Sequence, residues 1–142
     1  MTEKIPPIKL IFSEQFKDRL RILAKRYRSI RTDIQPLIDD LQIGKFIGDR
    51  IPGTGYTVFK VRLKNSDIQK GKSSGYRVIY QLKDNSCVLM LLIYAKSDQT
   101  DIPAQQIQDI IRVCWITVKY LWYKDYSPIK FPKSQEKGTE NG

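Results

Sequence analysis

The chain has 142 residues, enough for one domain with a single hydrophobic core and too few for two. It carries 25 Lys or Arg against 15 Asp or Glu, a formal net charge of +10, and it contains no histidine. This charge favours a polyanionic partner such as a nucleic acid, or an acidic protein. The lack of histidine, together with only two cysteines, argues against a zinc site.

The first 44 residues predict a strand and two helices. The opening segment MTEKIPPIKLIF is typical of neither a signal peptide nor a membrane span, and we expect a short strand over residues 8–12. Ser13 suits the N-cap of a helix. Apolar residues then repeat at helical spacing: Phe16, Leu20, Leu23 and Tyr27. A second helix is expected from Thr32, with Pro36 in its first turn and its exit at Gly44.

The middle of the chain predicts a sheet. Residues 48–56, GDRIPGTGY, are rich in turn formers and predict a loop. Strands are expected at 58–64, 76–82 and 87–94, with 65–75 as a charged loop. The third of these strands is apolar throughout, so we place it in the middle of the sheet, covered on both faces.

A last helix is expected from about Pro103, and its apolar stripe comprises Ile107, Ile110, Ile111 and Cys114. The predicted class is therefore α+β: a small, mostly antiparallel sheet packed with two N-terminal helices and a C-terminal helix. We expect a single domain over residues 1–126 and a disordered tail over 127–142. Cys87 and Cys114 lie in apolar sequence and are expected to be reduced core thiols, which suits a cytoplasmic protein.

Positive charge is concentrated in the predicted sheet. Residues 44–77 hold eight Lys or Arg and only two Asp or Glu. Strand alternation places Lys60, Arg62 and Lys64 on one face, roughly 7 Å apart. Arg77 begins the next strand, and the loop between them adds two more cations, Lys70 and Lys72. Such a ladder suits contacts to an extended phosphate backbone, although an ordinary solvated strand face has the same pattern.

Two further patterns have competing interpretations. Tyr76, Tyr80 and Tyr94 offer stacking surfaces for bases if they face the cations, and core packing if they do not. The sequence Gly71-Lys72-Ser73 resembles the end of a phosphate-binding P-loop, but the earlier glycine is missing and a strand, not a helix, follows. Clustered lysines and arginines can stabilise charge on a phosphorane, so RNA cleavage by its own 2′-hydroxyl is chemically feasible here.

The central segment GDRIPGTGYTVFKVRLKNSDIQKGKSSGYRVIYQL, followed by LLIYAKSDQTDI, resembles the RelE/HigB-type toxins of bacterial type II toxin–antitoxin modules. The resemblance covers about residues 8–113 and places the chain in the HigB-like branch. It implies a compact α+β fold and a metal-independent endoribonuclease, without a cofactor, that cuts mRNA on the ribosome. It also implies a cognate antitoxin protein as inhibitor.

Four residues match the basic positions of that family. Lys60 and Arg62 match the basic strand, Arg77 matches the arginine of the Gly-Tyr-Arg strand, and Lys96 matches the lysine after the apolar strand. The resemblance makes these four the candidate catalytic residues. Candidate RNA-binding residues are Lys64, Lys70, Lys72, Tyr76, Tyr80 and Tyr94. Ser97 stands where an arginine is usual, and the family's C-terminal tyrosine has no counterpart.

The main hypothesis is a ribosome-dependent mRNA endoribonuclease in which Arg77 stabilises the transition state while Lys60 and Arg62 bind the backbone. Lys96 either positions the substrate or transfers a proton. One alternative is a ParE-like gyrase poison that acts without catalysis. Another is an inactive toxin that still binds its antitoxin, which Ser97 and the aromatic extension 114–126 suggest.

Overall fold

A computed structural model describes residues 7–68, 74–99 and 101–125, with side chains described as far as Ile116. It contains three helices and one five-stranded sheet with the strand order β1-β5-β4-β3-β2. Strand β1 (Lys9–Phe12) is parallel to β5 (Cys87–Ala95). All other pairings are antiparallel, and they join β5, β4 (Tyr76–Asp84), β3 (Val58–Leu63) and β2 (Asp49–Arg50). The predicted α+β class is confirmed.

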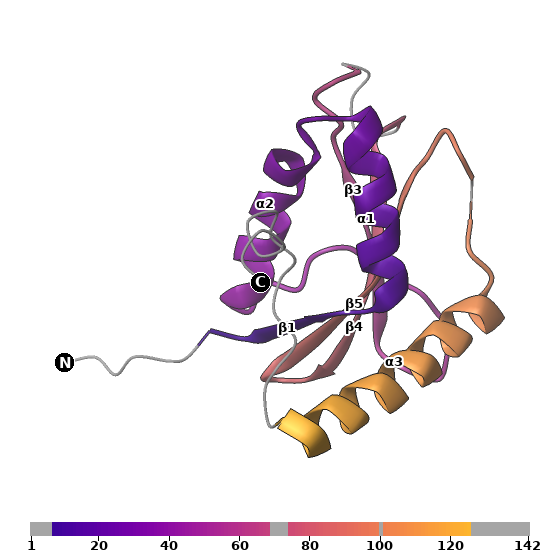
Figure 1. Ribbon diagram of the computed structural model, residues 1–142. Helices are drawn as coiled ribbons and strands as arrows, with labels where there is room; N and C mark the ends of the chain where they lie inside the picture. The colour runs from indigo at the N-terminus through magenta and orange to yellow at the C-terminus, as the bar shows by residue number, and fades with distance from the viewer. Residues whose placement is uncertain (1–6, 69–73, 100, 126–142) are drawn as a thin grey trace.

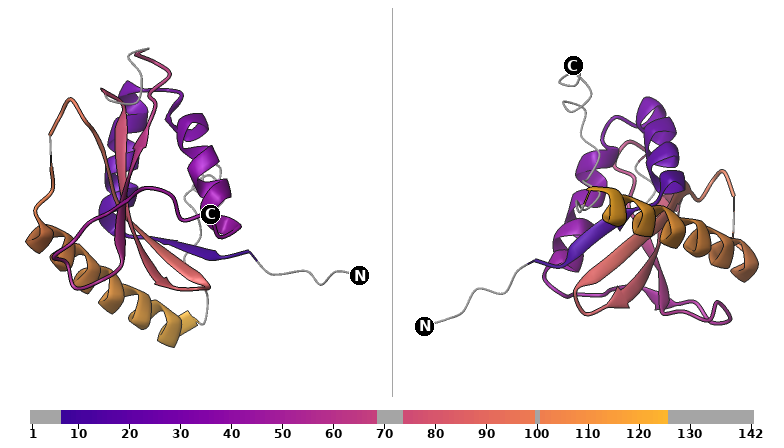
Figure 2. Two further views of the ribbon diagram at one scale, coloured as in Figure 1. Left: turned by 180° about the vertical axis from the view of Figure 1, so that it is seen from behind. Right: turned by 60° about the horizontal axis from the view of Figure 1, so that its bottom comes forward.

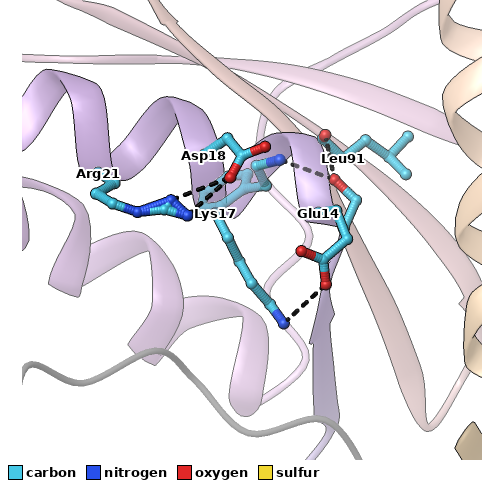
Figure 3. A network of polar contacts seen from close by, with 7 residues as sticks. Glu14, Lys17, Asp18, Arg21 and Leu91 are labelled. Carbon is cyan, nitrogen blue, oxygen red and sulfur yellow. Dashed lines mark hydrogen bonds and ion pairs between the residues drawn. The ribbon is translucent and has the colours of Figure 1, made fainter. Parts of the chain in front are cut away.

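Helix α1 (Glu14–Arg26) begins at the predicted cap. The Ser13 hydroxyl accepts a hydrogen bond from the Phe16 amide at 2.9 Å and donates one to the Leu91 carbonyl at 2.7 Å, so the cap also joins α1 to β5 (Figure 3). Ion pairs one turn apart line the solvent side of the helix: Glu14–Lys17 and Asp18–Arg21 (Figure 3). Lys17 and Arg21 therefore have acidic partners on their own helix.

Helix α2 (Ile30–Gln42) begins two residues earlier than predicted. Pro36 consequently lies in the second turn, and the prediction of a first-turn proline is wrong. The early start coincides with bonds from outside the helix, because the backbone and hydroxyl groups of Ser29 both donate to Asp67, at 3.0 and 3.1 Å. Gly44 follows the helix with φ of 92°, the left-handed conformation expected at such an exit.

Two strand predictions need adjustment. Asp49–Arg50, predicted as part of a loop, forms the short edge strand β2, paired with Phe59 and Lys60 of β3. Strand β5 is buried on both faces, as predicted for an apolar strand, but β4 occupies the middle of the sheet order. The reason is β1, which pairs with the outer side of β5 and makes it the second strand.

The sheet separates two hydrophobic layers (Figure 1). On one face, α1 and α2 pack their apolar stripes against alternate residues of all the long strands, including Val61, Val78 and Met90. On the other face, α3 (Ala104–Asp125) buries the predicted stripe of Ile107, Ile110, Ile111 and Cys114. Side chains alternate between the two layers along the strands, except that Leu91 and Leu92 of β5 both lie in the α3 layer, where the pairing of β4 with β5 shifts register.

Helix α3 includes most of the aromatic extension. Figure 2 shows the helix crossing one end of its sheet face, with the segment after β5 arching out to reach it. Two polar contacts also join α3 to the rest of the chain. The Gln108 amide donates to the Thr54 carbonyl at 2.9 Å, and the ammonium of Lys83 lies 4.5 Å from the Trp115 ring centroid. In the described part of the chain, no helix is both long and apolar enough to cross a membrane.

Candidate nucleic-acid interface

The register of the sheet gathers the basic residues at the end of the α3 face that α3 does not cover. Arg62 of β3 is directly opposite Arg77 of β4, and Arg77 is opposite Tyr94 of β5. Lys60 is two residues before Arg62 on β3 and shares its face of the sheet. Lys96 follows Tyr94 by two residues. We call Lys60, Arg62, Arg77 and Lys96 the cationic face. The residues come from three different strands or strand ends, so the fold brings them together.

Arg77 is the most enclosed of these cations, with 5% of its surface exposed. One of its guanidinium nitrogens donates to the Tyr76 carbonyl at 3.2 Å. Burial lowers its pKa below the usual value for arginine, and the neighbouring charge of Arg62 lowers it further, while Tyr94 and Asp101 act in the opposite direction. A buried cation next to a second cation is the electrostatic setting in which an added anion is most strongly stabilised.

Lys60 is held by an acid that the sequence did not single out. Its ammonium lies 3.1 Å from an Asp101 carboxylate oxygen, and both groups are at least partly exposed. The pKa of Asp101 is lowered first by this hydrogen bond and charge, and then by the charges of Lys96 and Arg77. Asp101 is therefore paired with Lys60 and is also influenced by the charges of Lys96 and Arg77.

The remaining cations lack such partners within the described ranges. There, Arg62, Lys64 and Lys96 form no ion pair with an acidic side chain, and their side chains range from half-buried to exposed. Lys17 and Arg21 of α1 differ, because each is paired with an acid along the helix. Within the cationic face, Arg62 and Lys96 therefore carry positive charge without an acidic partner among the described residues.

The three candidate tyrosines separate by parity. Tyr76 and Tyr80 lie on the α1 and α2 side of the sheet with no exposed surface. Tyr76 contacts Tyr27 edge-on, and Tyr80 stacks on Phe59 and donates to the Ile47 carbonyl at 2.6 Å. Stacking on a base requires an accessible ring, so neither tyrosine belongs to this interface.

Tyr94 does share the face of Arg77, but its side chain is 2% exposed and packs in the α3 layer. Burial raises the pKa of its hydroxyl, as does the charge of Asp101, while Arg77 lowers it. The ring lies beside Arg77 on the neighbouring strand and is too buried to stack on a base.

The three predicted lysine contacts to phosphate have different outcomes. Lys64 is exposed directly after β3, which ends at Leu63, one residue earlier than predicted. Lys70 and Lys72 lie outside the described residues. The missed residue is Asp101, 41 positions from Lys60 in the chain. Its only signal in the sequence is an acid between the apolar strand and the last helix, and nothing there indicates which cation it meets.

Chemically, the cationic face can bind a phosphodiester and neutralise charge that accumulates on its oxygens. Arginine offers paired N–H donors that match two phosphate oxygens, and lysine adds a mobile point charge. In the described ranges, no three His, Cys, Asp or Glu side chains are gathered as a metal-ligand set.

Comparison with known proteins finds little at the level of sequence. No family model matches the chain, and no curated protein matches it. Among solved structures, a double mutant of the E. coli toxin RelE in the free state is similar, with a TM-score of 0.46 and 17% sequence identity. The match covers 79% of this chain and 98% of that chain.

Proposed function

We propose that this protein is the toxin of a type II toxin–antitoxin module and a metal-independent endoribonuclease that cleaves mRNA on the ribosome. The observation that carries the proposal is the direct cross-strand pairing of Arg62 with Arg77. Like charges directly opposite each other destabilise a sheet, and Arg77 is also nearly buried. An anion bound between the two guanidinium groups relieves both costs, which is the property expected of a phosphate-binding site.

The roles follow from position. Lys60 and Arg62, two residues apart on one strand face, bind consecutive parts of the RNA backbone. Arg77, held from below by its bond to the Tyr76 carbonyl, meets the reacting phosphate. Its fixed position means that little reorganisation is needed as charge develops, which is the main source of electrostatic catalysis.

The reaction needs no external nucleophile. The 2′-oxygen of the ribose attacks the adjacent phosphorus, the O2′–P bond forms, and the bond from phosphorus to the 5′-oxygen breaks. The products are a 2′,3′-cyclic phosphate and a 5′-hydroxyl, after one proton leaves the 2′-hydroxyl and another reaches the 5′-oxygen. The cationic face stabilises the phosphorane between these events.

Lys96 takes one of two roles, positioning the substrate or transferring a proton. The two are separable, because arginine keeps the charge but does not release a proton near neutral pH. If Lys96→Arg cleaves as the wild type does, Lys96 positions the substrate. If the variant binds but does not cleave, Lys96 transfers a proton.

The deciding experiment is primer extension on an mRNA in cell-free translation. We compare wild type, Arg77→Ala and Arg21→Ala, and wild type with initiation blocked. Arg21 is the matched control, since it lies on α1 and is paired with Asp18. Discrete new 5′ ends that require Arg77 and active translation, but not Arg21, support the proposal. Intact mRNA in every reaction contradicts nuclease activity and favours a gyrase-directed or an inactive toxin. Growth arrest with DNA-damage signalling on expression would then indicate the gyrase-directed toxin, and normal growth would indicate the inactive one.

The sequence pattern shared with RelE/HigB-type toxins supports the second half of the proposal, a cognate antitoxin as inhibitor. Such a protein must cover or rearrange the cationic face to block RNA. Co-expression with the product of an adjacent open reading frame, followed by pull-down, tests this directly. Loss of growth arrest without a complex contradicts direct inhibition.

A further inference from the structure

The Lys60–Asp101 pair contributes little to holding the fold together. Asp101 has a side chain that is 79% exposed, and Lys60 one that is 29% exposed, and exposed ion pairs stabilise proteins only weakly. The same segment contains a second acid, Asp98, which pairs with Arg26 of α1 at 2.8 Å, on the side of the helical layer. Asp101 points to the sheet face instead.

The Asp101 carboxylate lies at a position where Lys60 can bind an anion. It is bonded to Lys60 at 3.1 Å, and the charges of Lys96 and Arg77 also act on it. A carboxylate and a phosphate present the same kind of anionic oxygen to lysine and arginine. The cations that Asp101 faces are the ones that the proposed function assigns to RNA.

We propose that Asp101 is a built-in competing anion, whose carboxylate occupies a phosphate position on the cationic face and must be displaced from Lys60 before RNA binds there. The inference rests on the proposed function, since it takes RNA as the displacing ligand. Its consequence is weaker binding of single phosphate groups, because each must first replace a carboxylate that the chain itself supplies. A ligand that contacts Arg62 and Arg77 at the same time displaces it more readily.

The test is a binding measurement with RNA that cannot be cleaved. A fluorescein-labelled, fully 2′-O-methylated oligonucleotide is titrated with wild type, Asp101→Asn and Asp98→Asn, and the dissociation constants are read from anisotropy. Asp98→Asn is the matched control, because it removes the same charge from the same segment but faces Arg26. Two further proteins, Lys60→Gln and the Lys60→Gln/Asp101→Asn double variant, complete a double-mutant cycle.

We expect Asp101→Asn to bind about two- to fivefold more tightly than Asp98→Asn, the change that loss of a weak exposed ion pair allows. We also expect this gain to vanish when Lys60 is already replaced. Equal affinities for Asp101→Asn and Asp98→Asn overturn the inference, because only net charge would then matter. A gain that persists without Lys60 overturns it as well.

Cleavage supplies the second readout. With the translation assay, Asp101→Asn is expected to cut mRNA at least as well as Asp98→Asn. Tight binding with lost cleavage in Asp101→Asn alone overturns the inference, because the carboxylate would then take part in the reaction. Failure of the proposed function gives a different result, in which wild type and Asp98→Asn neither bind the oligonucleotide nor cut mRNA. The inference about Asp101 then fails as well, because it takes RNA as the displacing ligand.

Discussion

Gly75 and Leu63 meet backbone to backbone where β3 and β4 converge. A Cβ atom on Gly75 would overlap the carbonyl oxygen of Leu63 and would also lie 3.0 Å from the Asn65 amide nitrogen. The Gly75 carbonyl in turn accepts a hydrogen bond from the Lys96 amide at 2.9 Å. This close approach brings the ends of three strands together beside Arg77 and explains why a glycine precedes Tyr76 and Arg77.

Replacing Gly75 with alanine is therefore expected to be costly. The methyl group meets backbone that cannot move aside without separating β3 from β4, so we expect the free energy of unfolding to fall by about 2 kcal/mol or more. Gly44→Ala is the comparison, because its φ of 92° is strained for alanine but the space is open, at a cost of about 1 kcal/mol. Urea unfolding measures both; equal losses would contradict the overlap.

Phosphate binding at the cationic face is expected to depend on Arg77. At about ten times its dissociation constant, inorganic phosphate should raise the melting temperature of the wild type by roughly 4 °C. Arg77→Gln should lose most of that shift, and Arg21→Gln should keep it, because Arg21 is on α1 and paired with Asp18. Differential scanning fluorimetry gives the three values. The same shift in all three proteins would indicate a general salt effect and no site.

Replacing tyrosine with phenylalanine is expected to have opposite effects on stability at the two buried tyrosines on the α1 and α2 side, Tyr76 and Tyr80. Tyr80→Phe removes a hydrogen bond of 2.6 Å to the Ile47 carbonyl and should cost about 1 kcal/mol. Tyr76→Phe should be neutral or stabilising, since the Tyr76 hydroxyl is buried with no hydrogen-bond partner in the described part of the chain. Urea unfolding compares them, and neither change should alter RNA affinity. Weaker RNA binding in either variant would contradict the assignment of both rings to the core.

The buried thiol of Cys114 is expected to cause part of the stability loss at alkaline pH. Burial raises the pKa of its thiol to about 11, so between the unfolded pKa near 9.0 and that value the unfolded chain loses a proton that the folded chain keeps. The thiol's full contribution to the free energy of unfolding is present below the unfolded pKa. It is lost as the pH rises from about 9 to about 11, by at most about 1.4 kcal/mol per pH unit. Cys114→Val should flatten the stability–pH curve from about pH 9 upward relative to wild type, whereas Cys87→Val should change it less. An unchanged slope in Cys114→Val would contradict the prediction.

The sequence predicted the elements better than the site. Helical spacing located α1 and the stripe of α3, and the apolar run of β5 was correctly expected to be covered on both faces. The errors occur where the chain is held by distant partners. Asp49–Arg50 becomes a strand only because β3 lies beside it, and α2 begins early where Ser29 is bonded to Asp67.

By itself, the sequence determined which side chains can share a face, because parity along a strand is a local property. It places Lys60 with Arg62 on one strand face, but it left open whether Tyr76 and Tyr80 face these cations, and the structure put both rings in the core on the other side. Only the tertiary structure decided that Arg62 stands opposite Arg77 and that Asp101 binds Lys60. Strand register and loop path depend on contacts between segments far apart in the chain, and no local spacing encodes them.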